Sequence, residues 1–272
     1  VEDDLLVEAV DICGTGGSGL PRINTSTLAA LLLASAGLKV AKHGNKAAAG
    51  RFGSFNLLEA LNVPIHLDAD STRKRLEALN LSFIFAPDIH PVFRHFAPVR
   101  TRIGVPTIFN VLGPLVNPLQ PTRQFIGTAF ADLMEVIFET GIKMGKEHVI
   151  VVRGEDGLDE VSISAPTKVL EYRGGERYAY HLTPAEFGIE EAVSLADVST
   201  PNSATTVSIA RAMLSGSPST PHHHRLVCVN AAFIYAKFVE PISYKAAYDK
   251  MEALLRTGVM GDTLKKYVQM AD

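Results

Sequence analysis

A glycine-rich loop between an apolar strand and an apolar helix is the feature that most constrains this chain. Residues 9–13 form a strand pattern, and four of the next six residues, 14–19, are glycines. Residues 24–27 then supply capping side chains for an apolar helix over 28–34 that ends at Gly37. Such a strand, loop and helix unit presents backbone N–H groups and a helix N-terminus to a phosphate.

Two common phosphate-binding patterns do not fit this loop. No Gly-Lys-Ser/Thr follows it, which excludes a P-loop. Its glycine spacing, and the lack of an acidic residue at the end of the next strand, exclude the dinucleotide-binding fingerprint. For the loop taken alone, a tight turn whose glycines serve packing remains the alternative.

Strand and helix patterns alternate along the rest of the chain. Strand patterns occur near residue 40 and over 83–85, 125–129 and 148–152, and a hairpin pattern covers 168–172 and 177–180. Helical patterns occur around 57–61 and over 70–79, 91–103, 133–144, 203–214, 226–238 and 244–256. This order predicts an α/β fold with a mostly parallel central sheet, an antiparallel hairpin and flanking helices, the last three covering one face.

Charge, hydropathy and cysteine content narrow the possible functions. With 26 Lys and Arg against 29 Asp and Glu, the formal charge of −3 gives no global positive field for nucleic acid or an anionic membrane. The longest apolar run, 28–36, is about half of the ~20 residues that span a bilayer. Cys13 and Cys228 have no metal or redox spacing, so we expect both to be reduced.

Two polar segments follow expected strands, where open α/β sheets bind ligands. Lys42-His43-Gly44-Asn45 offers a cation, an imidazole and an amide, although a loop that hydrogen-bonds to itself is the alternative. Asp159-Glu160 offers two adjacent carboxylates, which point apart on the backbone and therefore suit a hard cation that bridges phosphates. We expect both carboxylates to be exposed, and a solvated turn is the alternative.

Other polar residues receive a simpler interpretation. Asp70 and Ser71 are expected to cap the 70–79 helix. Arg94 and Arg100 in the 91–103 helix are too far apart in phase to share one face, and a surface ion pair is the alternative for each. The Ser-, Pro- and His-rich segment 215–224 is expected to be an exposed loop, whose consecutive histidines cannot converge on one tetrahedral metal site.

Seven motifs occur in this chain in an order found in one enzyme family. They are Asp11 to Gly17 ending in Gly-Thr-Gly-Gly, Asn24-Thr25-Ser26-Thr27, Lys42-His43-Gly44-Asn45, His90-Pro91, Val99-Arg100, residues 110–115 with Asn117-Pro118, and residues 157–161. Each motif is weak alone, but the combination spans nearly the whole chain. In this combination the chain resembles the anthranilate phosphoribosyltransferases.

The resemblance implies transfer of a 5-phosphoribosyl group from phosphoribosyl pyrophosphate (PRPP) to the amine of anthranilate, in tryptophan biosynthesis. It implies Mg²⁺ as the cofactor, PRPP and anthranilate as partners, and neither nucleic acid nor a membrane. The PRPP-binding residues it implies are Gly14, Thr15, Gly16, Gly17, Asn24, Ser26, Thr27 and Lys42. The implied metal ligands are Ser26, Asp159 and Glu160. The implied anthranilate-binding residues are Gly14, Asn45, His90, Arg100, Gly113 and Pro114, and the implied catalytic residues are Lys42, Asn45 and Arg100.

The chain also departs from the family pattern. Ser18 stands where the family usually has Asp, Lys46 where Arg is usual, and Phe52, Phe55 and Asn56 replace smaller or acidic residues. The family begins with a small helical domain, and this chain starts where that domain would end. We therefore expect residues 1–272 to be the α/β phosphoribosyl-transfer domain, with 88–118 helical and packing toward the small domain. A cytoplasmic enzyme is expected, and a homodimer where the helical domain is present.

Three alternatives remain. A phosphoribosyltransferase with another aromatic acceptor is the main one, because Phe52 and Phe55 can reshape the acceptor side. A pyrimidine nucleoside phosphorylase shares the architecture but has a different second loop. A non-catalytic nucleic-acid-binding homologue would need a strongly positive charge balance, which the chain lacks.

Overall fold

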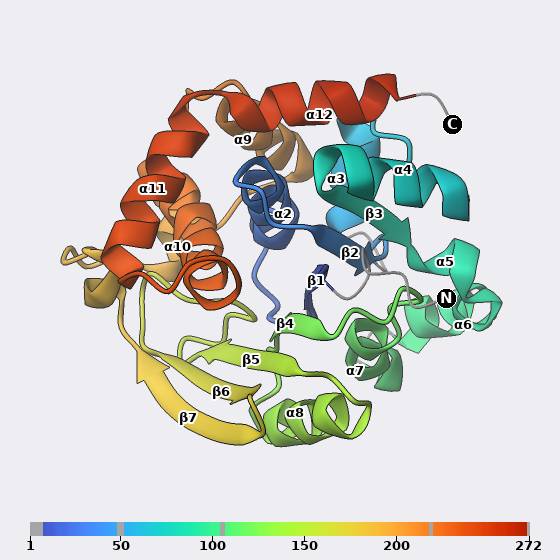
Figure 1. Ribbon diagram of the computed structural model, residues 1–272, viewed down its shortest axis with the longest axis horizontal. Helices are drawn as coiled ribbons and strands as arrows, with labels where there is room; N and C mark the ends of the chain where they lie inside the picture. Colours follow the sequence, from blue (N-terminus) through green and yellow to red (C-terminus); the bar gives the residue numbers. More distant parts are fainter. Residues whose placement is uncertain (1–7, 48–51, 104–106, 218–219, 271–272) are drawn as a thin grey trace.

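The computed structural model describes residues 8–47, 52–103, 107–217 and 220–270 (Figure 1). These residues form a seven-stranded sheet with the order β3-β2-β1-β4-β5-β6-β7. The strands are β1 (Val10–Gly14), β2 (Val40–Gly44), β3 (Leu81–Phe85), β4 (Arg123–Gly127), β5 (His148–Gly154), β6 (Thr167–Arg173) and β7 (Glu176–Leu182). The pairs among β1 to β5 are parallel, and β6 pairs antiparallel with both β5 and β7, which confirms the predicted mixed sheet.

Helices cover both faces of the sheet. They are α2 (Thr25–Ser35), α3 (Ser54–Ala60), α4 (Ala69–Leu79), α5 (Ala86–Ile89), α6 (Pro91–Ile103), α7 (Ile108–Leu115), α8 (Met134–Lys143), α9 (Ser203–Leu214), α10 (Pro221–Phe238), α11 (Tyr244–Arg256) and α12 (Val259–Gln269). Short 3-10 turns lie at Ala131–Leu133, Pro184–Phe187 and Leu195–Val198. In Figure 1, α2 and α9 to α12 lie on one side of the strands, and α7 and α8 on the other.

Two apolar clusters account for this layering. The larger cluster joins α2, α3 and α9 to α12 to one face of the sheet, and the smaller joins α7 and α8 to the other. Strands covered on both faces are buried continuously rather than at every second residue, and β1 to β3 have that pattern although they include the buried polar residues Asp11, Lys42 and His43. Helix α2, apolar all round, is buried almost throughout, as its sequence predicts.

Three local expectations were wrong. The cap of α4 is Asp68, whose side chain accepts a hydrogen bond from the Ser71 backbone, rather than Asp70. Residues 221–224 are not loop, because α10 begins at Pro221 and buries His223 and His224. Proline at a first helical position is favourable because its missing N–H would have no intrahelical partner. Helix α12 was not expected, although its apolar stripe, which includes Met260, packs on the core.

Within the segment 88–118, the described residues include the helices α6 and α7. Its helices α6 and α7 leave apolar side chains exposed, among them Val92, Phe96, Ile108 and Leu112. That this segment packs toward a small helical domain stays a prediction. Among the described residues, no helix is both long enough and apolar enough to cross a bilayer.

One glycine in the central sheet should be sensitive to a single added carbon. A Cβ on Gly127 would lie 1.8 Å from the Asp159 carbonyl oxygen, whereas nothing lies within 4 Å of a Cβ on Gly113. We expect Gly127→Ala to lower the free energy of unfolding by about 1–3 kcal/mol, because backbone must move to make room. Gly113→Ala, the matched control, should change it by less than about 0.5 kcal/mol. Urea denaturation measures both, and equal effects would contradict the close contact.

Candidate active site

The carboxyl ends of the parallel strands meet at one edge of the sheet. β1 lies between β2 and β4, and Gly14 at the end of β1 pairs with Gly127 at the end of β4. The chain adds β2 and β3 on one side of β1, then returns to add β4 and β5 on the other. Open α/β sheets bind ligands at such a reversal point. The loops that follow β1, β2, β4 and β5 therefore form the candidate active site.

The glycine loop after β1 is fixed at its first residues. The Thr15 backbone N–H donates to the Gly127 carbonyl at 2.9 Å, and the Thr15 hydroxyl accepts from the Ala129 backbone at 3.2 Å. Asn110 donates to the Thr15 carbonyl at 3.1 Å. Beyond this anchor, Gly16 and Gly17 have positive φ angles of 63° and 92°, which favour glycine.

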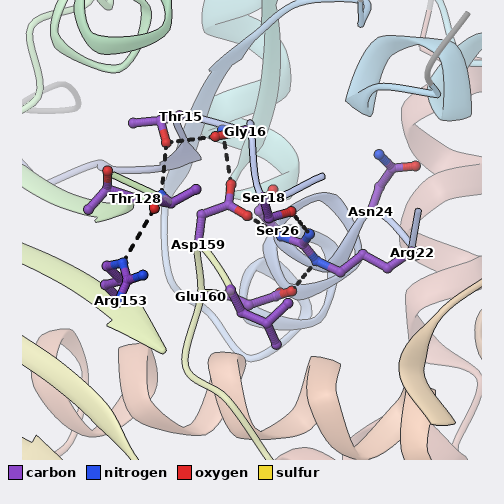
Figure 2. Close-up of polar contacts among 12 residues, drawn as sticks. Thr15, Gly16, Ser18, Arg22, Asn24, Ser26, Thr128, Arg153, Asp159 and Glu160 are labelled. Carbon is purple, nitrogen blue, oxygen red and sulfur yellow. Dashed lines mark hydrogen bonds and ion pairs between the residues drawn. The ribbon is translucent and has the colours of Figure 1, made fainter. Parts of the chain in front are cut away.

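The acidic pair after β5 reaches back to this loop. Asp159 Oδ2 accepts from the Gly16 backbone N–H at 2.9 Å (Figure 2). Arg22 donates through Nη2 to Asp159 and through Nε to Glu160, so one guanidinium bridges both carboxylates. The expectation of exposed carboxylates was wrong, because the Asp159 and Glu160 side chains are each only 7% exposed. Sequence inspection missed Arg22, which is 137 positions away from Asp159.

Burial and charge oppose each other in this cluster. Burial raises the pKa of Glu160 above its ordinary value, and the Arg22 charge offsets part of that increase. For Arg22 burial alone would lower the pKa, but the charges of Glu160 and Asp159 raise it overall. The guanidinium is therefore fully charged, and the three side chains together carry a charge of −1 when both carboxylates are ionised.

Lys42 is buried between β1 and the first turn of α2. Its ammonium donates to the Ile12 carbonyl at 2.6 Å and to the Ser26 hydroxyl at 3.1 Å. Burial lowers the pKa of Lys42, while the nearby Asp11 favours its charged form. The structure therefore brings together the predicted residues Lys42 and Ser26, and joins the end of β2 to the first turn of α2.

The N-terminus of α2 keeps unsatisfied oxygen atoms. Asn24 is the N-cap residue, but its side chain makes no capping hydrogen bond and its amide instead donates to the Phe52 carbonyl at 3.3 Å. Within the described residues, Asn24 Oδ1 and Thr27 Oγ1 are buried and have no hydrogen-bond partner. Buried polar atoms are rarely left unpaired, so these two are suited to a ligand.

Two of the residues that the resemblance assigns to anthranilate, His90 and Gly113, contact His43. Its Nδ1 lies 3.2 Å from the Gly113 carbonyl, and its ring packs edge-on against His90 with centroids 5.4 Å apart. His90 Nε2 lies 2.8 Å from the Val116 carbonyl. The Asn45 carboxamide oxygen accepts from the Lys46 backbone at 2.7 Å. His90 and Gly113 are thus neighbours, whereas the Arg94 and Arg100 side chains lie outside the described residues.

Three residues that depart from the family pattern, Phe55, Asn56 and Lys46, have defined contacts in the structure. Phe55 packs on Phe85 in the core with ring centroids 4.9 Å apart, so it does not line the acceptor side. The Asn56 side chain accepts from the Gly53 and Ala47 backbones at 3.0 and 3.1 Å and closes the loop before α3. Lys46 pairs with Glu59 at 2.6 Å.

Comparisons with known proteins agree on one family. Residues 6–260 match the glycosyl transferase family, a/b domain. The chain is 39% identical over 259 residues to the anthranilate phosphoribosyltransferase of Pasteurella multocida, a match covering 95% of this chain and 77% of that protein. The relative from Herpetosiphon aurantiacus is 39% identical over 97% of this chain and 78% of its own length.

Solved structures extend the agreement to the fold. The anthranilate phosphoribosyltransferase of Thermus thermophilus superposes with a TM-score of 0.85 at 36% identity, over 96% of this chain and 77% of that one. The Saccharomyces cerevisiae enzyme in complex with PRPP and Mg superposes at 0.83 with 26% identity, over 97% and 73%. Identity over nearly the whole chain and the shared fold show that this chain belongs to the anthranilate phosphoribosyltransferase family.

Proposed function

We propose that this chain transfers the 5-phosphoribosyl group of PRPP to the amine of anthranilate and releases pyrophosphate, as in tryptophan biosynthesis. The observation that carries the proposal is the glycine loop after β1, held beside the Asp159–Glu160 pair at the reversal point of the sheet. Two unpaired buried cysteines, Cys13 and Cys228, support a reducing compartment such as the cytoplasm for the reaction.

PRPP is assigned to the glycine loop and the N-terminus of α2. The backbone of Gly14, Thr15, Gly16 and Gly17 offers N–H groups to the pyrophosphate. The unpaired oxygens of Asn24 and Thr27 suit ribose hydroxyls, which can donate to them. Ser26 and Lys42 complete the set, with the Lys42 ammonium countering phosphate charge.

The donor set beside this loop fits Mg²⁺. Asp159, Glu160 and Ser26 offer only oxygen ligands, which this hard cation prefers. When bound, Mg²⁺ supplies positive charge that stabilises the pyrophosphate as it departs. Arg22 binds the same two carboxylates, so the site is built for a cation.

The chemistry requires positioning and charge stabilisation. C1 of the ribose gains positive character as the bond to pyrophosphate breaks, and the arylamine then attacks it. Loop N–H groups and Lys42 stabilise the negative charge that develops on the leaving group. The chain must also hold the amine in line with C1. No strong base is needed for the attack of the amine on C1.

Anthranilate is assigned to Gly14, Asn45, His90, Arg100, Gly113 and Pro114. The contacts that join His43, His90 and Gly113 support this assignment. His43 has Nδ1–H as the donor to the Gly113 carbonyl, so its buried Nε2 is an acceptor with no partner in the described part of the chain. The amine of anthranilate is a donor of matching type.

Fluorescence tests the assignment directly. Anthranilate fluorescence should fall with time when the protein is mixed with PRPP and Mg²⁺. Other aminobenzoates, run in parallel, should react more slowly. A faster reaction with another aminobenzoate would identify a different aromatic acceptor, and the absence of reaction with every acceptor would refute the proposal.

Neutralising the acidic pair should abolish activity and also lower stability. In Asp159→Asn with Glu160→Gln, the buried Arg22 loses both counter-charges, at a cost of about 2–3 kcal/mol in the free energy of unfolding. Mg²⁺-dependent turnover should disappear. Glu155→Gln is the matched control, because Glu155 lies in the same loop but is exposed, and it should leave both properties nearly unchanged. Wild-type turnover in the double variant at saturating Mg²⁺ would rule out the metal assignment.

Two arginines of α6 provide a matched pair for the acceptor site. Arg100→Ala should raise the KM for anthranilate by about ten- to a hundredfold, because a charge-assisted hydrogen bond is worth about 1.5–3 kcal/mol. The KM for PRPP should change little. Arg94→Ala, in the same helix but without a family match, should leave both constants near wild type. An equal rise of both KM values in Arg100→Ala would show that Arg100 supports the structure and does not bind anthranilate.

His43 should give the stability a distinct pH dependence. Burial, then the neighbouring His90, lowers the pKa of His43 from 6.5 to about 4. The unfolded chain therefore binds a proton at a higher pH than the folded chain, and the stability is lost as the pH falls from about 6.5 toward 4. Relative to His43→Gln, wild type should lose about 2–3 kcal/mol of unfolding free energy between pH 7 and 4.5. Urea titrations of both proteins measure this, and a pH-independent difference would mean that His43 is not held neutral.

A further inference from the structure

Arg22 lies between Asp159 and Glu160, the two carboxylates that the proposed function assigns to Mg²⁺. Its Nη2 binds Asp159 Oδ1, its Nε binds Glu160 Oε1, and its Nη1 donates to the Ser18 hydroxyl at 2.6 Å (Figure 2). The planar guanidinium thus uses all three of its nitrogens. Because a hard cation would need the same carboxylate oxygens, Arg22 and the metal cannot both hold them fully.

The burial of the cluster makes this competition strong. The Arg22 side chain is 14% exposed and each carboxylate 7% exposed, so little water screens their charges. A metal that enters must replace a charged, hydrogen-bonded partner rather than water. The free protein should therefore bind divalent cations more weakly than the two carboxylates alone would.

The backbone at Arg22 is anchored independently of its side chain. Arg22 pairs with Ser199 in an isolated antiparallel bridge, and the Thr200 N–H donates to the Pro21 carbonyl at 2.8 Å. The next residue, Ile23, is buried in the core. The long side chain can therefore change partners by rotation while the loop keeps its path.

The alternative partner for the guanidinium lies in the same loop. Ser18, which already accepts from Arg22, belongs to the glycine loop to which the pyrophosphate of PRPP is assigned. A pyrophosphate bound there offers oxygen atoms of high negative charge, and guanidinium groups bind phosphate oxygens well. Rotation toward this anion would release the carboxylates.

We propose that Arg22 is the resident counter-cation of the Asp159–Glu160 pair, and that it yields these carboxylates to Mg²⁺ only when the pyrophosphate of PRPP takes its guanidinium. This inference rests on the proposed function for the identity of the polyphosphate. It makes Arg22 a positioning residue that couples metal binding to substrate binding, and linkage requires the coupling to act in both directions.

Mn²⁺ alone tests the competition without any turnover. Titration of the free Mn²⁺ signal by electron paramagnetic resonance gives the affinity of the substrate-free protein. Arg22→Met should bind Mn²⁺ about tenfold more tightly than wild type, because the competing charge is gone. Arg22→Lys, which keeps the charge, should stay closer to wild type. Arg153→Met removes another guanidinium at this edge, one that contacts the Ala129 carbonyl, and should not change the affinity.

PRPP added to the same titration tests the coupling, after the Mn²⁺ that PRPP itself chelates has been measured in a protein-free titration and subtracted. It should raise the Mn²⁺ affinity of wild type by a larger factor than that of Arg22→Met. Circular dichroism checks that each variant is folded, and Arg22→Gln replaces Arg22→Met if the latter does not fold. Equal Mn²⁺ affinity of wild type and the neutral variant would overturn the competition, and equal enhancement by PRPP would overturn the coupling. The two failures are distinguishable: the coupling alone fails when PRPP raises the Mn²⁺ affinity of both proteins by the same factor above one, whereas the proposed function fails when PRPP raises neither affinity and anthranilate fluorescence does not fall.

Discussion

The backbone of Asp159 lies against Gly127 at the end of β4, so closely that any side chain on Gly127 would collide with it. Gly127 is also the register partner of Gly14, where the phosphate loop begins. A Cβ on either glycine would collide with Asp159, so the two glycines allow the loop after β5 to approach the reversal point of the sheet. Because of this contact, Asp159 reaches the Gly16 N–H and Glu160 reaches Arg22. The candidate site depends on the missing Cβ atoms more than on any single polar contact.

A buried polar network supports the same edge from below. Asp11 of β1, fully buried, accepts from the His43 backbone of β2 and from the Gln124 side chain of β4, each at 3.2 Å. Burial raises the pKa of Asp11 to about 6, and the neighbouring Lys42 partly offsets that increase. One carboxylate therefore joins three adjacent strands, near the amino ends of β1 and β4 and the carboxyl end of β2, beneath the edge from which the ligand-binding loops begin. Such a network is most stabilising when every polar atom in it is paired, and within the described residues Gln124 Oε1 is buried without a hydrogen-bond partner.

The features that depend on residues close together in the sequence were predicted correctly, whereas contacts between residues far apart in the sequence were missed. The strand, glycine loop and helix unit of residues 9–34 was correct, because strand hydrophobicity and glycine content are local properties. Asp159 and Glu160 were expected in solvent, because no local feature indicates that Arg22 folds onto them. His223 and His224 were assigned to a loop because the segment is rich in Ser, Pro and His. In the structure they belong to the first turn of helix α10, and both are buried. Phe55 was given a role at the acceptor side, yet its position in α3 turns it into the core.

The pairing of Ser18 with Arg22 gives this chain a different charge balance from the family pattern. A carboxylate at position 18 would add a third acid beside Asp159 and Glu160 and leave the cluster at −2 with one guanidinium. With a serine there, the cluster carries −1, and the hydroxyl accepts the remaining guanidinium N–H without adding charge. A lower negative charge weakens the attraction for a metal ion and also weakens the repulsion of a polyphosphate. The two effects have opposite sign, so the serine makes the cluster less attractive to a free cation and less repulsive to a polyphosphate than a third carboxylate would.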